Sequence, residues 1–407
     1  MKIQMTNNSA VLGLMSAFPL LVVLLVVLSL GCDGSETSVA SSSPSELAQE
    51  VRLALAEPYY VDRNARLASA MRQLTADNVD SVVGVYSELL KDLGQSELEP
   101  LFDAWARFDA PAGFAYALDV PFEPAAEFAQ KAASYSWAAR DVLAARVAVE
   151  EAAAERPRKA MVLYKSMIEG WAMSGQDGLD DFILRGPSAS DPGQLILAAQ
   201  PKIYLRDGIE GLLEWSESMI RDATEYAARM KSFRYAVRTA AYRDPRAAIP
   251  FVLRHYGEEY ASEGPRVLVE KWMETDTEAA LAWLRTEAPE EARADALGMA
   301  ATSWLHRDPN SARAWIDSLP LGDPYYQPAF DRVAIRMSKR DPAGAVEWCH
   351  RGQPPELNST CLRQVAINWY RKDPVAAGVW MEEESGLSAE DMHEVRERGR
   401  KKSPKPR

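Results

Sequence analysis

Two adjacent acids, Asp180 and Asp181 in the stretch GLDDFIL, are the residues of this chain best suited to catalysis. Paired carboxylates act as general acid and base in the cleavage of glycosidic bonds. Neighbouring residues on a helix point about 100° apart, however, and the chain holds 59 Asp and Glu in all. The sequence therefore favours solvated acids at a helix start over a catalytic pair.

Other residue types that carry chemistry are few and scattered. The four histidines are His255, His306, His350 and His393, of which we expect His306 and His350 to face solvent. The sequence contains no HExxH, paired CxxC, GxSxG or phosphate-binding loop. Because metal sites need clustered ligands, we expect no metal, no cofactor and no enzymatic activity. The formal net charge of −13 argues against a nucleic-acid partner and against an anionic lipid surface.

The N-terminus has the features of an export signal. The run Val11–Leu30 is uncharged, mostly apolar and long enough to span a bilayer, and it ends in SLGCDGS with Cys32. It resembles a bacterial lipoprotein signal, although Ser29 stands where that family usually has Leu. The resemblance implies that residues 1–31 are removed, that Cys32 is lipidated, and that the protein is anchored on the periplasmic side of the cell envelope, at the inner or the outer membrane. An uncleaved membrane anchor is the alternative.

Composition divides the rest of the chain into three parts. Residues 32–45 are rich in Ser and Gly and predict a flexible tether. Residues 391–407 end in the basic sequence RERGRKKSPKPR and predict a disordered tail. A helical repeat array is expected over residues 46–390, with its most regular part at 232–385 and a degenerate part near 175–225.

The array is predicted from a motif that recurs. Trp304–Pro320 reads WLHRDPNSARAWIDSLP, and its copies are spaced by 32, 32, 33 and 32 residues when aligned on their Asp. Asp accepts a hydrogen bond from a free N–H at a helix start, and Pro fits the first helical position. Each unit is therefore expected to hold two helices of about 11–14 residues. The predicted caps, including two weaker upstream copies, are Asp109, Asp141, Asp244, Asp276, Asp308, Asp341 and Asp373.

Two short helices cannot bury their apolar faces alone, but stacked units share a continuous core. We therefore predict an all-α fold, an α-solenoid of stacked two-helix repeats of about 32 residues that can wind into a superhelix. The segment AATSWLHRDPNSARAW resembles the tetratricopeptide repeat and its HEAT-like relatives in its small and aromatic positions. The unit is about two residues shorter than the tetratricopeptide consensus, so the resemblance implies the architecture only.

Weaker, unevenly spaced copies of the motif place Asp177 and Asp207 in the degenerate part. The eleven tryptophans lie near these two Asp residues or near the predicted caps, about four before or seven to eight after them. This placement favours a buried core, and an exposed aromatic stripe that binds sugars or peptides is the alternative. In the regular part of the array the predicted core tryptophans are Trp272, Trp283, Trp304, Trp315, Trp348, Trp369 and Trp380.

Two cysteines, Cys349 and Cys361, remain in a chain interpreted as exported. They lie on consecutive predicted helices, so they form either a disulfide or two separately buried thiols.

The sequence favours a membrane-tethered, non-catalytic scaffold that binds a partner protein in the cell envelope. The alternative is a protein that binds or degrades envelope polysaccharide on a helical toroid. A structural spacer is a third, weaker hypothesis.

Overall fold

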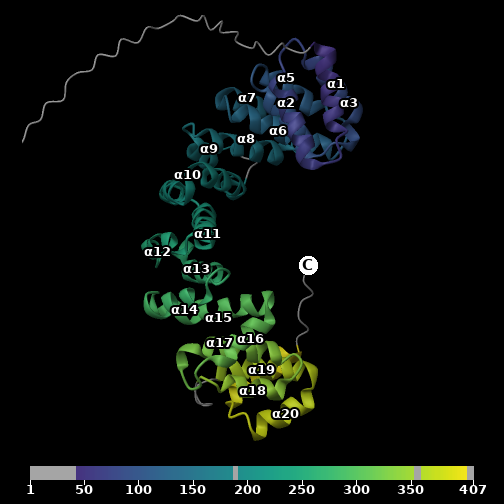
Figure 1. Cartoon of the computed structure of the whole chain (residues 1–407). Helices are drawn as coiled ribbons and strands as arrows, with labels where there is room; N and C mark the ends of the chain where they lie inside the picture. The colour runs from purple at the N-terminus through teal and green to yellow at the C-terminus, as the bar shows by residue number, and fades with distance from the viewer. Residues whose placement is uncertain (1–42, 187–190, 353–358, 401–407) are drawn as a thin grey trace, which may run out of the picture. The chain divides into compact units, whose positions relative to one another are not determined.

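The described part of the chain is built of helices. The computed structural model describes residues 43–186, 191–352 and 359–400, so the predicted signal at 1–31, Cys32 and most of the tether lie outside the described residues. Within the described ranges there are 21 α-helices, three short 3-10 helices and no strand (Figure 1). The prediction of an all-α fold is confirmed. The 3-10 helices are η1 Leu90–Asp92, η2 Glu259–Ala261 and η3 Pro324–Tyr326.

The helices form two layers, A and B. Each layer A helix packs on the next layer A helix along the chain, and most layer B helices pack on the layer A helices before and after them. This neighbour-to-neighbour packing is consistent with a repeat-like array. Layer A consists of α2 Tyr60–Arg72, α4 Gln95–Trp105, α6 Ala125–Ala138, α8 Ala160–Ser174, α10 Pro192–Asp222, α11 Tyr226–Arg243, α13 Gly264–Trp272, α15 Glu290–Arg307, α17 Gln327–Met337, α19 Ser359–Lys372 and α21 Ala389–Arg400. Layer B consists of α1 Pro44–Leu55, α3 Val79–Leu89, α5 Ala110–Asp119, α7 Val142–Glu155, α9 Leu179–Arg185, α12 Pro245–Arg254, α14 Thr277–Thr286, α16 Pro309–Ser318, α18 Pro342–Cys349 and α20 Pro374–Glu383.

All seven predicted Asp caps lie at the start of a layer B helix, where the side chain accepts a backbone N–H. Asp308, for example, accepts from the Ser311 N–H at 3.1 Å. From α12 onward the layer B helices have only 8 to 10 residues, so the expected length of 11–14 is wrong for them. The 32-residue repeat as a structural unit stays a prediction.

Six of the seven tryptophans of the regular part form three pairs across the turn between the layers, whereas Trp348 packs on Phe330. The ring centroids lie 5.3 Å apart for Trp304 and Trp315 and 5.4 Å apart for Trp369 and Trp380. In each pair one indole comes from the end of a layer A helix and the other from the layer B helix that follows. Four of the seven predicted core tryptophans are buried, and Trp304, Trp315 and Trp369 are half-buried. The buried four are Trp272, Trp283, Trp348 and Trp380.

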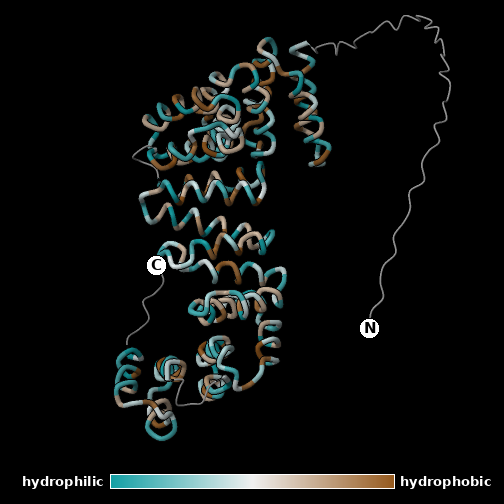
Figure 2. The backbone as a smooth tube through the Cα atoms, turned by 90° about the vertical axis from the view of Figure 1, so that its left-hand side faces the viewer, coloured by the Kyte–Doolittle hydropathy of each residue, from teal (hydrophilic) through white to brown (hydrophobic). Residues whose placement is uncertain are grey.

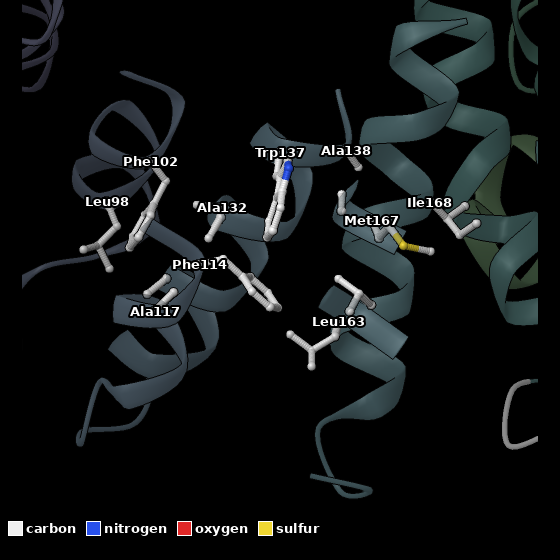
Figure 3. Packing of buried hydrophobic residues seen from close by; sticks show 14 of the residues in the cluster. Leu98, Phe102, Phe114, Ala117, Ala132, Trp137, Ala138, Leu163, Met167 and Ile168 are labelled. Atoms are coloured by element: carbon white, nitrogen blue, oxygen red, sulfur yellow. The ribbon is translucent and has the colours of Figure 1, made fainter. Parts of the chain in front are cut away.

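The N-terminal helices share a core in which aromatic rings span the layers. Apolar and polar residues are interspersed along the helices, as Figure 2 shows, so each helix has a face to bury. Phe102 of α4, Phe114 of α5, Trp137 of α6 and Met167 of α8 belong to this core (Figure 3). The Phe114 and Trp137 centroids are 5.6 Å apart in an edge-on arrangement.

The degenerate part of the sequence pattern has a structural cause. Helix α9 has only seven residues, whereas α10 has 31 and is interrupted at Gly208, whose φ of 74° lies in the region that favours glycine. The uneven spacing of Asp residues near 175–225 reflects this short helix and this long, kinked one. Despite its length α10 is polar, and no helix in the described ranges is apolar enough over a sufficient length to cross a membrane.

Both predicted ends of the array need correction. Helix α1 already begins at Pro44, with Ser43 and Glu46 forming a capping box. The predicted disordered tail from residue 391 is wrong over its first ten residues, because α21 extends to Arg400. Val395 of α21 is buried, and Arg363 of α19 pairs with Asp391 at 2.7 Å. Residues 401–407 lie outside the described part.

Candidate functional site

A hollow of about 730 Å³ lies on layer A between α4 and α10, and we call it the α4–α10 groove. It is lined by three neighbouring helices, α4, α6 and α8, with Lys202 added from α10. Along each helix the lining residues recur every four positions, because residues i and i+4 share a helix face. The rows are Gln95, Glu99 and Asp103 on α4, Glu127, Lys131 and Tyr135 on α6, and Met161, Lys165 and Glu169 on α8.

The groove forms because its middle helix, α6, carries small side chains between its charged ones. Helix α6 is rich in alanine and lines the groove with Ala132 and Ser136 between the longer side chains. Helix α8 comes very close to α6 at Gly170, where an added Cβ would lie 2.2 Å from the carbonyl oxygen of Tyr135. The small residues of α6 and the missing side chain at Gly170 thus set the spacing of the helices that carry the charged rows.

The charges of the groove are only partly paired. Glu127 and Lys131 form an ion pair at 2.5 Å, and this hydrogen bond lowers the pKa of Glu127. Lys202 Nζ lies 3.7 Å from Glu169 Oε2 and 5.0 Å from the ring centroid of Tyr135. Within the described residues Lys165 makes no ion pair or hydrogen bond, so its ammonium group is available to a ligand.

The two sides of the groove differ in charge. The α4 side carries Glu99 and Asp103, and Asp103 is also bound by Arg140 at 2.7 Å. The α8 and α10 side carries Lys165 and Lys202, together with Glu169, the ion-pair partner of Lys202. Between them, burial and then the charge of Glu169 raise the pKa of Tyr135, so its hydroxyl stays protonated and can donate a hydrogen bond.

The acids singled out from the sequence line a second hollow of about 520 Å³, which we call the α8–α10 hollow. Asp180 accepts hydrogen bonds from Trp215 Nε1 at 2.5 Å and from Ser218 Oγ at 3.2 Å. Burial raises the pKa of Asp180, and these two hydrogen bonds only partly oppose the shift. Asp181 pairs with Arg185 at 2.8 Å. Asp180 is thus half-buried rather than solvated, and it ties α9 to α10.

A polar cluster that the sequence interpretation missed surrounds His255. This ring is buried at the end of α12, with Nε2 3.0 Å from Glu217 Oε2 and Nδ1 2.8 Å from the Tyr260 hydroxyl. Burial raises the pKa of Glu217, but hydrogen bonds from His255 and Arg254 outweigh it, so that its pKa is lowered. The cluster joins α10, α12 and η2. Glu217 and His255 are 38 residues apart in the sequence, too far for any local motif to connect them.

Cys349 and Cys361 form a disulfide between α18 and α19, with their Cα atoms 5.7 Å apart and both side chains buried. Of the two arrangements left open by the sequence, the bridged one is therefore present. Disulfides persist in oxidising compartments and are rare in the cytosol of most organisms, which agrees with an extracytoplasmic location.

Fold and grooves together define an all-α protein whose helices pack on their neighbours in the chain. Comparison with family models, with curated proteins and with solved structures finds no match. In the ranges that the structure describes, no three His, Cys, Asp or Glu side chains come together as a metal site would require. The function is therefore argued from the grooves themselves.

Proposed function

We propose that this protein is a membrane-tethered, non-catalytic scaffold of the cell envelope that binds an extended segment of a partner protein in the α4–α10 groove. The observation that carries the proposal is the set of three rows of side chains on α4, α6 and α8, all of them polar except Met161. A ligand that crosses several layer A helices in turn is the usual binding mode of helical repeat proteins. We further propose that the array consists of two-helix repeats of about 32 residues.

The charges of the groove indicate what the partner segment carries. Glu99 suits a basic side chain along one edge of the segment, and the unpaired Lys165 suits an acidic group along the other. Tyr135 lies between them with a protonated hydroxyl that suits a main-chain carbonyl. A segment with both acidic and basic side chains therefore fits better than a uniformly charged polymer.

The test compares partner binding by two variants, one with a charge reversed inside the groove and one with the same charge reversed outside it. Lys165→Glu removes the unpaired ammonium group without breaking an ion pair of the described chain, and Lys339→Glu makes the same change in net charge at an exposed position after α17. We expect Lys165→Glu to weaken partner binding about tenfold or more, since about 1.4 kcal/mol corresponds to tenfold. Lys339→Glu is expected to leave binding unchanged. Equal effects of the two variants, in titrations with the partner captured from membranes, would refute the groove as the binding site.

Binding of envelope polysaccharide remains a second candidate, and the α8–α10 hollow is the observation that favours it. Its lining combines the indole of Trp215 with several carboxylates and the guanidinium group of Arg185, residue types that stack on and hydrogen-bond to sugars. Purified cell-wall polymer that binds the wild-type chain and Lys165→Glu equally well would favour this function over the scaffold.

A further inference from the structure

The first two helices expose an apolar surface that the groove does not use. Tyr59, Tyr60 and Val61, at the start of α2, are exposed by 71%, 59% and 76%, and Leu53 at the end of α1 is exposed by 59%. Scattered exposed apolar residues are ordinary, but a contiguous run of them marks an interaction surface. Pro58 in the same turn is exposed as well.

The exposed surface continues along α2. Val61, Ala65 and Ala68 are spaced as i, i+4 and i+7, all three are exposed, and they therefore share one helix face. The buried residues of α2, Leu67, Ala70 and Met71, lie on a different side. We call the exposed residues Leu53, Pro58, Tyr59, Tyr60, Val61, Ala65 and Ala68 the α2 patch.

The position of α2 in the array leaves this surface without a cover. Every other layer A helix has a layer A helix before it in the chain, whereas α2 is the first. The outer face of a terminal repeat is ordinarily polar, because nothing stacks on it. The apolar α2 patch departs from that rule, so a separate partner has to account for it.

The charges around the α2 patch are compatible with an anionic surface, although the chain as a whole is acidic. Arg52 pairs with Glu88, and Arg66 pairs with Glu57, so these two acids are neutralised, and the exposed Asp62 is left as an acid beside Val61. Arg72 lies four residues beyond Ala68 on the same face of α2, is exposed, and makes no ion pair within the described chain. Its guanidinium group is suited to a phosphate.

The sequence that precedes α1 indicates which surface is near. Ten residues lie between Cys32, just after the apolar run, and Ser43, the cap of α1. Even fully extended, a segment of this length reaches only about 40 Å. A short linker of this kind gives a millimolar effective concentration. A patch that binds the membrane with only millimolar affinity could not hold an untethered protein there, but it is sufficient to keep a tethered one in contact with the membrane.

We propose that the α2 patch rests in the headgroup region of the membrane that anchors the chain. Tyr59 and Tyr60 have an apolar ring and a polar hydroxyl, a combination enriched at membrane interfaces. Val61, Ala65 and Ala68 face the acyl boundary, and Arg72 meets a lipid phosphate. The contact holds the first helix pair on the bilayer. This proposal rests on the membrane tether of the proposed function.

The test places a small fluorophore in the patch of the full-length chain. Bimane is attached to Ala65→Cys, or to Val375→Cys as a control at an exposed apolar position of α20. The native Cys349 and Cys361 are bridged and unreactive, and in the tethered chain the lipid on Cys32 blocks the third thiol. Each protein is reconstituted in vesicles of phosphatidylcholine and phosphatidylglycerol with and without doxyl-labelled lipid, a quencher that acts at short range.

The expected result is about twofold lower emission at Ala65→Cys with doxyl lipid, because an interfacial helix is buried about 5–10 Å into the headgroup boundary. The control at Val375→Cys is expected to keep its emission. Replacing Tyr59, Tyr60 and Val61 by Ser in the labelled chain should abolish the quenching. Vesicle-bound protein that shows no quenching at Ala65→Cys, or shielding from aqueous iodide without lipid quenching, would overturn the proposal. Failure of the chain to bind vesicles at all would overturn the tether, and the patch with it.

Discussion

Replacing Gly170 by alanine tests the packing that creates the α4–α10 groove. An alanine Cβ at this position would lie 2.2 Å from the Tyr135 carbonyl oxygen and 3.0 Å from the Ala139 nitrogen, both of them backbone atoms of the α6 segment. Side chains elsewhere do not come within 3.0 Å of a Cβ, so α6 and α8 must separate by at least 0.8 Å (from 2.2 to 3.0 Å). Close-packed interiors do not absorb such a shift without cost.

The free energy can be worked from two opposing effects. Overpacking costs about 1–3 kcal/mol, whereas exchanging glycine for alanine inside a helix gains about 1 kcal/mol. For Gly170→Ala we therefore expect a net loss of up to about 2 kcal/mol in the free energy of unfolding. Gly84→Ala in α3 is the matched control, since no atom lies within 4 Å of the added Cβ. That variant should gain about 0.5–1 kcal/mol.

The assay is urea unfolding of both variants, with hydrogen exchange of α6 and α8 peptides to locate the effect. Opposite shifts of the urea midpoint, with faster exchange at α6 and α8 in Gly170→Ala alone, are the expected result. Partner binding in the groove should weaken in the same variant, because the charged rows move apart. If Gly170→Ala stabilised the protein as much as Gly84→Ala, the close approach of α6 and α8 would be refuted.

Three further predictions concern other parts of the chain. Removing the disulfide by Cys349→Ala with Cys361→Ala should lower the free energy of unfolding by about 3 kcal/mol, because the bridge closes a 12-residue loop and restricts the unfolded chain. An unchanged urea midpoint would contradict this stabilisation. The intact native chain should also have a mass two units below that of its reduced form. Because the pKa of Asp180 is raised in the folded state, the stability of the wild-type protein should fall as the pH rises above the ordinary pKa of 3.8. Asp180→Asn can still accept the hydrogen bond from Trp215 but does not titrate, so this variant should lack the part of the decline that Asp180 causes. Thermal unfolding at a series of pH values measures both. Asp308→Ala should cost about 1 kcal/mol and Asp308→Asn much less, since asparagine also caps; equal melting temperatures for the two variants would speak against the cap.

The sequence predicted the local starts of helices well, because an Asp that caps and a Pro at the first helical position act within three residues of each other. All seven predicted Asp residues cap layer B helices, and Pro follows directly in four of them, Asp244, Asp308, Asp341 and Asp373. The end of the array was less predictable. Its last helix contains few apolar residues and is held by Val395 and by the pair of Arg363 with Asp391, an interaction across 28 residues that no local pattern reveals.

The grooves could not be predicted from the sequence, because they depend on the distance between helices. The rows of four-spaced polar residues on α4, α6 and α8 are visible in the sequence, but similar rows occur on any solvated helix face. Only Gly170 and the alanines of α6 bring three such rows to one hollow. For the same reason Asp180 was expected to be solvated, whereas Trp215 and Ser218 enclose it from another helix.

Site-specific photocrosslinking tests the central claim, partner binding in the α4–α10 groove, most directly. A benzophenone amino acid is placed at Lys165 in the groove or at Lys339 outside it, in the full-length chain in its native membrane. The account predicts that position 165 crosslinks to one extended segment of the partner, rich in both acidic and basic residues, and that position 339 does not. Crosslinking of the same partner from position 339, with none from position 165, would contradict it.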